Sequence, residues 1–206
     1  MYRFFSLFLS RLIKKTFTPK IVNELLIAFD EFKVKELASK FGSLGENYHI
    51  KNVAYIGNAK YIKIGNNFSS WYNLRIEAID EYMDQKFNPI IIIGDNVNIG
   101  SDCHIGCINQ ISIGNNVLMA GRVFITDHFH GNISSDDLCD TPSKRRLYSK
   151  GPVIIGDNVW IGEGVCIMPG VTIEKNSIIG ANAVVTKSCE ANSVLVGNPA
   201  KMLKKI

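Results

Sequence analysis

The sequence of 206 residues lacks most features of a cross-linked, metal-stabilised or strongly charged protein. Its five cysteines are an odd number and form neither a C-x-x-C pair nor a closely spaced Cys/His cluster. This pattern disfavours a disulfide framework and a zinc finger, and it favours reduced thiols in a cytoplasmic protein. The formal net charge is only +4 at pH 7, which does not by itself indicate nucleic-acid binding.

Long apolar runs are scarce as well. The apolar core from Phe4 to Ile13 is interrupted by polar residues and is too short to span a bilayer, and no small-residue cleavage site of a secretory signal follows it. Its apolar side chains share one helical face, so residues 1–15 could contact a membrane surface or pack on protein. We expect a cytoplasmic protein. If residues 1–15 contact a membrane surface, the protein would lie at the inner face of the membrane.

A second N-terminal helix is predicted from capping residues and spacing. Thr18 and Pro19 form an N-cap and first-turn pair, and apolar residues then recur at helical spacing through Phe32. We expect this helix to run to about Phe41, and Gly42 and Gly45 to end it.

From residue 50 the period changes to six. Every sixth residue within unbroken blocks is aliphatic, a glycine often follows it, and a small residue often stands four positions after it. The inward aliphatic series is Ile93, Ile99, Ile105, Ile113, Met119, Ile125, Ile155, Ile161, Ile167, Ile173, Ile179 and Val185. This period fits a chain wound around a triangular prism, with one short strand per face and glycine relaxing the corners. Cys103 and Cys189 occupy the small slot and are interpreted as packing residues.

The repeat breaks in three places, which solenoids commonly use for function. Two residues are added around Asn109 and Gln110, a polar excursion covers residues 80–89, and a long loop covers residues 127–152. The long loop opens with two histidines, His128 and His130. Imidazole is well matched to proton transfer near neutral pH, and although solvated loop histidines are the alternative, the position at the largest insertion favours a functional role.

Four segments then identify a family resemblance. They are IGDNVWIG (155–162), MPGVTI (168–173), IIGANAVVTKS (178–188) and VGNPAKMLKKI (196–206). With the hexads they resemble hexapeptide-repeat acyltransferases, in particular the sugar O-acetyltransferases of bacterial polysaccharide and lipopolysaccharide pathways and the maltose and galactoside acetyltransferases. The resemblance covers residues 50–206.

The resemblance implies a mainly β protein, a left-handed parallel β-helix that assembles as a homotrimer with active sites between subunits. It implies acetyl-CoA as co-substrate, a sugar or glycan hydroxyl as acceptor, no metal and no nucleic-acid partner. We therefore expect an N-terminal α-helical segment at residues 1–45 and a β-helix acyltransferase domain at residues 46–206, with an insertion at 127–152.

The resemblance assigns His128 as the general base of direct transfer in a ternary complex, with His130 ranked second. Asp102 takes the place of an acceptor-binding asparagine, with a solvated corner residue as the alternative. Asp127 adjoins His128, and neighbours on an extended chain point opposite ways, so we expect Asp127 to contact the acceptor rather than the ring. Trp160 is assigned to the wall of the acceptor site, with packing as the alternative.

The same resemblance places coenzyme A along small and basic residues. These are Gly162, Ala181, Thr186 and Lys187 in the groove, then Lys201 and Lys204 near the nucleotide phosphates. The run Lys144, Arg145 and Arg146 could meet an acidic glycan or the coenzyme phosphates, or could simply be solvated. Leu147 stands near the point where galactoside enzymes carry a glutamate, which argues against a simple galactoside acceptor.

Three other functions stay open. Transfer to an amino sugar uses the same base. A zinc hydratase like the γ-class carbonic anhydrases needs three converging imidazoles, but His104 and His130 lie four hexads apart, hence on different faces. A non-catalytic scaffold is the third alternative, and the histidine loop argues against it.

Overall fold

The computed structural model describes residues 18–132 and 139–206, and the chain forms two units with the boundary between Ser39 and Lys40. Helix α2 (Pro19–Ala38) belongs to the first unit and the strands belong to the second. The segment at residues 1–15, with its predicted membrane or protein contact, lies outside the described residues. Within the described ranges, no helix combines the length and the apolar character needed to cross a bilayer.

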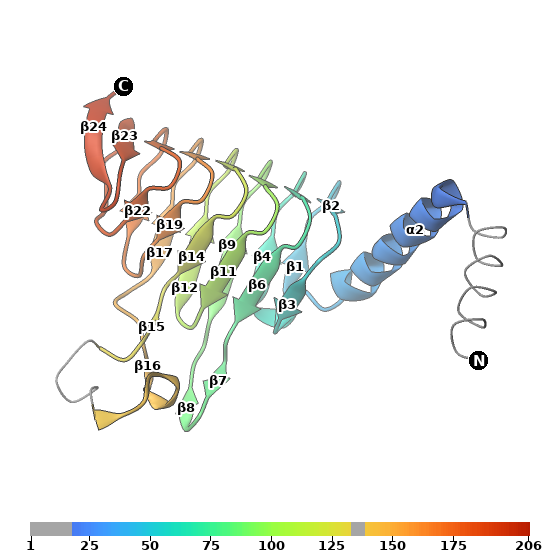
Figure 1. The fold of residues 1–206 in the computed structure, drawn as a ribbon, viewed down its shortest axis with the longest axis horizontal. Helices are drawn as coiled ribbons and strands as arrows, with labels where there is room; N and C mark the ends of the chain where they lie inside the picture. Colours follow the sequence, from blue (N-terminus) through green and yellow to red (C-terminus); the bar gives the residue numbers. More distant parts are fainter. Residues whose placement is uncertain (1–17, 133–138) are drawn as a thin grey trace, which may run out of the picture. The chain divides into compact units, whose positions relative to one another are not determined.

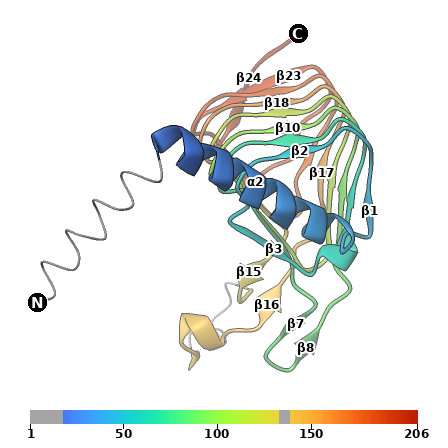
Figure 2. The same cartoon turned by 90° about the vertical axis from the view of Figure 1, so that its right-hand side faces the viewer.

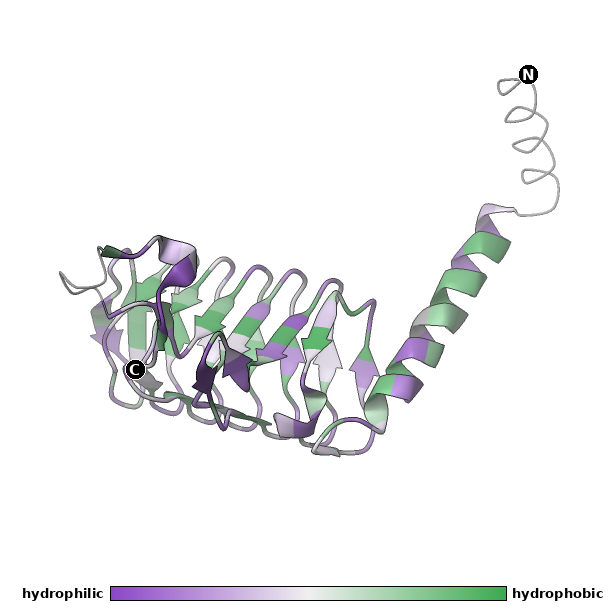
Figure 3. Ribbon diagram, turned by 90° about the horizontal axis from the view of Figure 1, so that it is seen from below, coloured by the Kyte–Doolittle hydropathy of each residue, from purple (hydrophilic) through white to green (hydrophobic). Residues whose placement is uncertain are grey.

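Helix α2 begins as its sequence predicts. Thr18 is the N-cap, its hydroxyl accepts a hydrogen bond from the N–H of Ile21 at 3.3 Å, and Pro19 stands in the first turn. Figure 3 shows hydrophobic and hydrophilic residues alternating along the helix. Val34 is buried, whereas seven other large apolar side chains of the helix are exposed in the single chain. They are Ile21, Val22, Leu25, Leu26, Ile27, Phe29 and Phe32.

The second unit is a parallel β-helix with three faces (Figures 1 and 2). Face 1 contains β1 (Ser43–Leu44), β4 (Ile62–Ile64), β9 (Ile90–Ile93), β12 (Gln110–Ile113), β17 (Val153–Ile155) and β20 (Thr172–Ile173). Face 2 contains β2 (His49–Ile50), β5 (Ser69–Ser70), β10 (Asn98–Ile99), β13 (Leu118–Met119), β18 (Trp160–Ile161), β21 (Ile178–Ile179), β23 (Ser193–Val196) and the antiparallel β24 (Lys201–Lys205). Face 3 contains β3 (Tyr55–Gly57), β6 (Arg75–Ala78), β11 (His104–Cys107), β14 (Phe124–Thr126), β19 (Cys166–Ile167) and β22 (Val184–Val185).

The core confirms the hexad prediction. All twelve predicted inward aliphatics are buried, with at most 2% of each exposed. Ile155 is in parallel register with Ile173 one coil later, as the period predicts. Cys103 and Cys189 are buried in this core, and desolvation raises the pKa of the Cys103 thiol to about 11. Both cysteines therefore act as packing residues.

The β-helix begins slightly earlier than predicted. Helix α2 ends at Ala38 rather than near Phe41, and the N–H of Gly42 already donates to the carbonyl of Ile62 at 3.0 Å. Strand β1 then pairs in parallel with β4. Residues 42–44 therefore already belong to the first coil of the β-helix, although the boundary was expected at residue 46.

Asparagine, rather than glycine, makes the left-handed turns at the corner between faces 1 and 2. The column is Asn47, Asn67, Asn96, Asn116, Asn158, Asn176 and Asn192, with φ between 56° and 59°. Their side-chain amides hydrogen-bond to one another from coil to coil at 2.8–3.2 Å. The glycines that follow the inward aliphatics instead permit close approach between coils, since a Cβ on Gly94 would lie 2.9 Å from the backbone of Gly114.

The two longer insertions form hairpins that contact each other. The first pairs β7 (Glu81–Tyr82) with β8 (Gln85–Lys86). The second pairs β15 (Phe129–His130) with β16 (Leu147–Tyr148), and the short helix η3 (Pro142–Lys144) lies between these two strands in the chain. The Gln85 side chain donates to the carbonyl of Leu147 at 3.0 Å and accepts its N–H at 2.7 Å. Both hairpins extend from the same side of the prism in Figures 1 and 2. The second insertion is therefore an ordered wall in its described parts, where the sequence suggested only a loop.

Candidate active site

The His128 ring is fixed through its Nδ1 atom at the end of face 3. Nδ1 lies 3.0 Å from Oδ1 of Asp127 and 3.2 Å from Oγ1 of Thr126. The side chain of His128 is 12% exposed and that of Asp127 is fully buried. None of the hydrogen bonds of the described residues uses Nε2 of His128. With the Nδ1–H donating to the carboxylate, the tautomer assigned from this network leaves a lone pair on Nε2.

The expectation that Asp127 and His128 point apart is wrong. The chain bends at Asp127 instead of continuing as an extended strand, because the N–H of His128 donates back to the Thr126 hydroxyl at 3.3 Å. This turn brings the carboxylate onto the imidazole of the next residue. Asp127 is fully buried, so it presents no surface to an acceptor within this chain.

Backbone N–H groups hold the Asp127 carboxylate at the point where two residues are added to the repeat, around Asn109. Oδ1 accepts the N–H of Ile108 at 2.9 Å, and Oδ2 accepts the N–H of Asn109 at 2.7 Å. The Cys107 thiol also donates to Oδ2 at 3.2 Å, and desolvation, followed by the nearby carboxylate, raises the pKa of that thiol. The sequence marked this break in the repeat but not its purpose, which is to turn backbone donors toward a buried anion.

A second imidazole, which the sequence treated only as a metal-ligand candidate, lies beside this group. A Cβ placed on Gly106 would lie 3.4 Å from Cε1 of His128 and 3.7 Å from Nε2 of His104. His104 is in β11, in register with Phe124 of β14, so it shares face 3 with the segment that leads to His128. Its partner in the sequence argument, His130, lies off the prism in β15.

His130 belongs to the wall that the two insertions form. Its ring is edge-on to Tyr82 at 5.5 Å between centroids, and the Tyr82 hydroxyl lies 3.4 Å from its Nδ1. The same hydroxyl donates to the carbonyl of Ser143 at 2.7 Å. The basic run is also on this wall, where Arg146 pairs with Asp84 at 2.9 Å. Lys144 and Arg145 directly precede Arg146 in the chain; Lys144 is exposed and Arg145 is half-buried.

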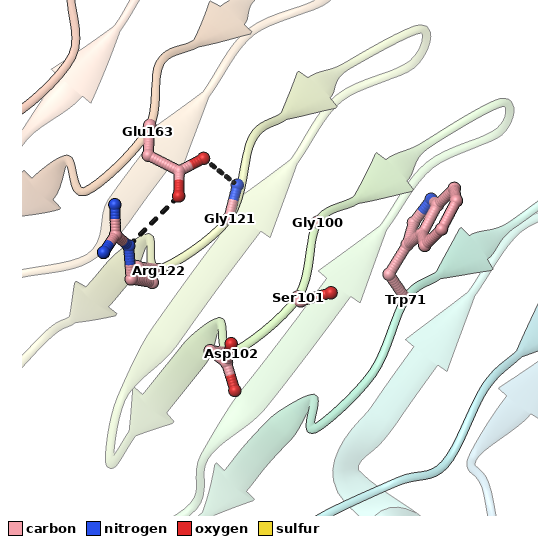
Figure 4. A pocket seen from close by; sticks show the side chains of 7 residues that line it. All are labelled: Trp71, Gly100, Ser101, Asp102, Gly121, Arg122 and Glu163. Carbon is pink, nitrogen blue, oxygen red and sulfur yellow. Dashed lines mark hydrogen bonds and ion pairs between the residues drawn. The ribbon is translucent and has the colours of Figure 1, made fainter.

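Asp102 lies at the opposite edge of face 3 from His128. It occupies a left-handed turn before β11 (φ 59°) and accepts the side-chain amide of Asn73 at 2.9 Å. Asp102 lines an open hollow of about 540 Å³. Figure 4 shows Trp71 at one end of this hollow and the Glu163–Arg122 ion pair at the other. A single chain therefore does not bring Asp102 to His128.

The residues predicted to hold coenzyme A are divided between the two edges of face 3. Gly162 and Ala181 occupy the edge of Asp102, and a Cβ on Gly162 would lie 2.7 Å from the Ala181 backbone nitrogen, so the small size of Gly162 serves coil stacking. Thr186 lies at the edge of His128, in a hollow of about 290 Å³ whose lining includes Phe129 and Met168. Lys187 follows it and is exposed.

The remaining predicted site residues lie on face 2. Trp160 is 52% exposed on β18, so its packing alternative is not met within the single chain. Lys201 and Lys204 lie on the exposed strand β24. None of these three lines the hollow beside Asp102 or the hollow beside Thr186.

All five cysteines are free. Among residues 18–132 and 139–206, no three His, Cys, Asp or Glu side chains are grouped so that they could hold a metal ion.

The coil of six-residue repeats with a histidine at its insertion defines a hexapeptide-repeat transferase. Two family models match the chain, "Bacterial transferase hexapeptide (six repeats)" over residues 152–187 and "Hexapeptide repeat of succinyl-transferase" over residues 90–127. WbbJ of Escherichia coli (strain K12), named as a lipopolysaccharide biosynthesis O-acetyl transferase, is 37% identical over 76% of this chain and 78% of its own length. The galactoside O-acetyltransferase of the same organism is 32% identical over 85% and 68%.

A solved structure of galactoside acetyltransferase in complex with coenzyme A has a TM-score of 0.53 and 28% identity, and the match covers 89% of this chain and 78% of that one. The chain therefore belongs to the hexapeptide-repeat acyltransferase family, which confirms the resemblance of its motifs, and it is an acetyltransferase.

Proposed function

We propose that this protein transfers the acetyl group of acetyl-CoA to a hydroxyl of a sugar or glycan, as a step in making a surface polysaccharide or lipopolysaccharide precursor. The observation that carries the proposal is the imidazole of His128, which the buried Asp127 holds at Nδ1 and whose Nε2 has no hydrogen-bond partner among the described residues. The names of WbbJ and of the coenzyme A complex support the acceptor class and the donor. The free cysteines are in keeping with a cytoplasmic reaction.

His128 acts as the general base in this proposal. A sugar hydroxyl is too weak an acid to attack a thioester unaided, so Nε2 takes its proton as the C–O bond forms and the C–S bond breaks. The proton then passes from Nε2 to the departing thiolate of coenzyme A. Asp127 stabilises the imidazolium, and the bound acetyl-CoA supplies the activated acyl group. No covalent enzyme intermediate is required.

The binding roles of the remaining residues are proposals as well. Ala181, Thr186 and Lys187 present exposed positions for the pantetheine arm, and the lysines of β24, Lys201 and Lys204, supply charge for the nucleotide phosphates. Gly162 takes part through its backbone. His130, Asp102 and Trp160 line the acceptor side of the assembled site.

We propose a homotrimer because the predicted site residues lie at two edges of face 3. Asp102 and Ala181 follow strands of face 2, whereas His128 and Thr186 follow strands of face 3. A neighbouring prism would bring one edge against the other. Light scattering of the purified protein should give three times the chain mass of 22.9 kDa. A monomer that retains full activity would overturn this arrangement.

The function is tested by incubating the purified protein with acetyl-CoA and separate acceptors. The panel contains galactose, rhamnose, N-acetylglucosamine, UDP-N-acetylglucosamine, glucosamine and galacturonate, and mass spectrometry detects one added acetyl group. We expect acetylation of at least one hydroxyl acceptor, with coenzyme A released in equal amount. Acetylation confined to glucosamine would instead indicate transfer to the amine of an amino sugar. Acetyl-CoA binding without transfer to any acceptor would contradict the proposal.

A further inference from the structure

A row of polar side chains extends from His128 across the outer surface of face 3. Tyr55, Arg75 and His104 are in register on β3, β6 and β11. Glu77 is in register with Gly106, the residue beneath the two imidazoles. Because side chains alternate along a strand, these positions project outward while the core isoleucines project inward.

His104 has an unused polar atom in this row. Its Nε2 is buried and finds no hydrogen-bond partner among the described residues. The nearest carboxylate oxygen, on Glu77, is 4.0 Å away, beyond hydrogen-bond distance. The Phe124 ring lies 5.2 Å from the imidazole between centroids. Desolvation, followed by the nearby Arg75, lowers the pKa of His104, so the ring is neutral at neutral pH. A buried, unpaired nitrogen costs free energy unless a ligand pairs with it.

The far end of the row is an open hollow of about 460 Å³ lined by Tyr55, Arg75 and Glu77. Arg75 forms an ion pair with Glu77, so the two charges offset each other. Tyr55 is 55% exposed and its ring lies over Gly57, where a Cβ would come within 2.9 Å of it. An aromatic ring beside a paired guanidinium and carboxylate suits an uncharged ring with several hydroxyls.

We propose that the acceptor binds along this row, with its reacting hydroxyl above Gly106 between His128 and His104 and its neighbouring ring over Glu77, Arg75 and Tyr55. The inference rests on the proposed function and deepens it. It makes His104 an acceptor contact whose Nε2 hydrogen-bonds the sugar, and it names an uncharged sugar as the acceptor class. The absence of a side chain at Gly106 provides the space that the hydroxyl needs.

Gly106→Ala tests whether the acceptor hydroxyl needs the space above Gly106. The added methyl group would meet both rings at ordinary contact distances, and the backbone of Gly106 is not left-handed, so the fold should be retained. A methyl group in a fitted subsite changes kcat/KM by roughly 10- to 200-fold. We expect such a loss for the acceptor that gives the highest turnover in the panel, with the KM for acetyl-CoA within about twofold of wild type.

His104→Ala and His104→Gln separate contact from packing. His104→Ala should lower kcat/KM for the acceptor by roughly tenfold or more, mainly through KM, and His104→Gln should restore part of it because its amide can reach the position of Nε2. His49→Ala, which removes an exposed imidazole on β2, should match wild type.

The outcomes distinguish the two proposals. If wild type transfers acetyl to no acceptor, the proposed function fails and this inference fails with it. If wild type transfers but Gly106→Ala and His104→Ala keep wild-type kcat/KM for the acceptor, only this inference is overturned. Preference for galacturonate over galactose would also overturn it, because a carboxylate would face the Glu77 end of the row.

Discussion

Replacing His128 by alanine is expected to reduce acceptor-dependent release of coenzyme A by about 10²–10⁴-fold, the range typical for loss of a general base. The reason is geometric, because a buried carboxylate holds Nδ1 of His128 and leaves the opposite ring nitrogen, Nε2, to take the proton. The measurement is steady-state turnover with saturating acetyl-CoA and the acceptor identified in the panel.

The fold should survive this change. Asp127 keeps the N–H groups of Ile108 and Asn109, so the carboxylate stays paired when the imidazole is removed. Circular dichroism and the trimer mass should match wild type. The matched control is His49→Ala, which removes an exposed imidazole from β2 and should leave turnover unchanged. Undiminished turnover in His128→Ala would refute the assignment of the base.

Replacing Asp127 by asparagine is expected to damage both activity and stability. The amide keeps the shape of the carboxylate, but its NH₂ group must replace one of the two oxygens. In place of Oδ2 it would face the N–H of Asn109, and in place of Oδ1 it would face the N–H of Ile108 and the Nδ1–H of His128. One unsatisfied buried donor costs about 1–3 kcal/mol. For a chain of this length that lowers Tm by roughly 2–12 °C. Turnover should fall by roughly 10²-fold, since the tautomer of His128 is no longer fixed.

The kinetic pattern separates a positioning role from an acceptor contact. If Asp127 positions the ring, kcat falls while the KM for the acceptor changes little. Asp84→Asn is the control, because the pair that Asp84 forms with Arg146 is exposed and its loss should leave Tm within about 2 °C of wild type. A raised acceptor KM with normal kcat and normal Tm in Asp127→Asn would assign Asp127 to the acceptor instead.

The prism and its core were predictable because each coil repeats one local rule. An inward aliphatic every sixth residue fixes which side chains stack, and all twelve are buried. The cap of α2 was predictable for the same reason, since Thr18 and Pro19 act on neighbouring backbone. The corners were less predictable. Glycine was expected to turn the chain, yet a column of hydrogen-bonded asparagines does so, because each amide can tolerate a left-handed residue and also bond to the next coil.

The candidate site was only partly predictable. His128 stood out at the mouth of an insertion, and the break at Asn109 was visible in the repeat. Their connection was not, because the backbone that holds Asp127 comes from the preceding coil. His104 was judged by counting hexads from His130, but the insertion lifts His130 off the prism.

The sequence by itself determined the family, the coil period, the buried column and the histidine at the insertion, because each depends on residues that are near one another in the chain or on a repeated spacing. The tertiary structure decided which groups meet. It turned Asp127 onto His128 and placed His104 beside Gly106, the glycine that also lies next to the His128 ring. It also joined the two insertions into one wall and left Asp102 at the opposite edge of face 3. These contacts join successive coils through parallel register, and the two added residues and the two hairpins shift that register in ways that a local pattern does not encode.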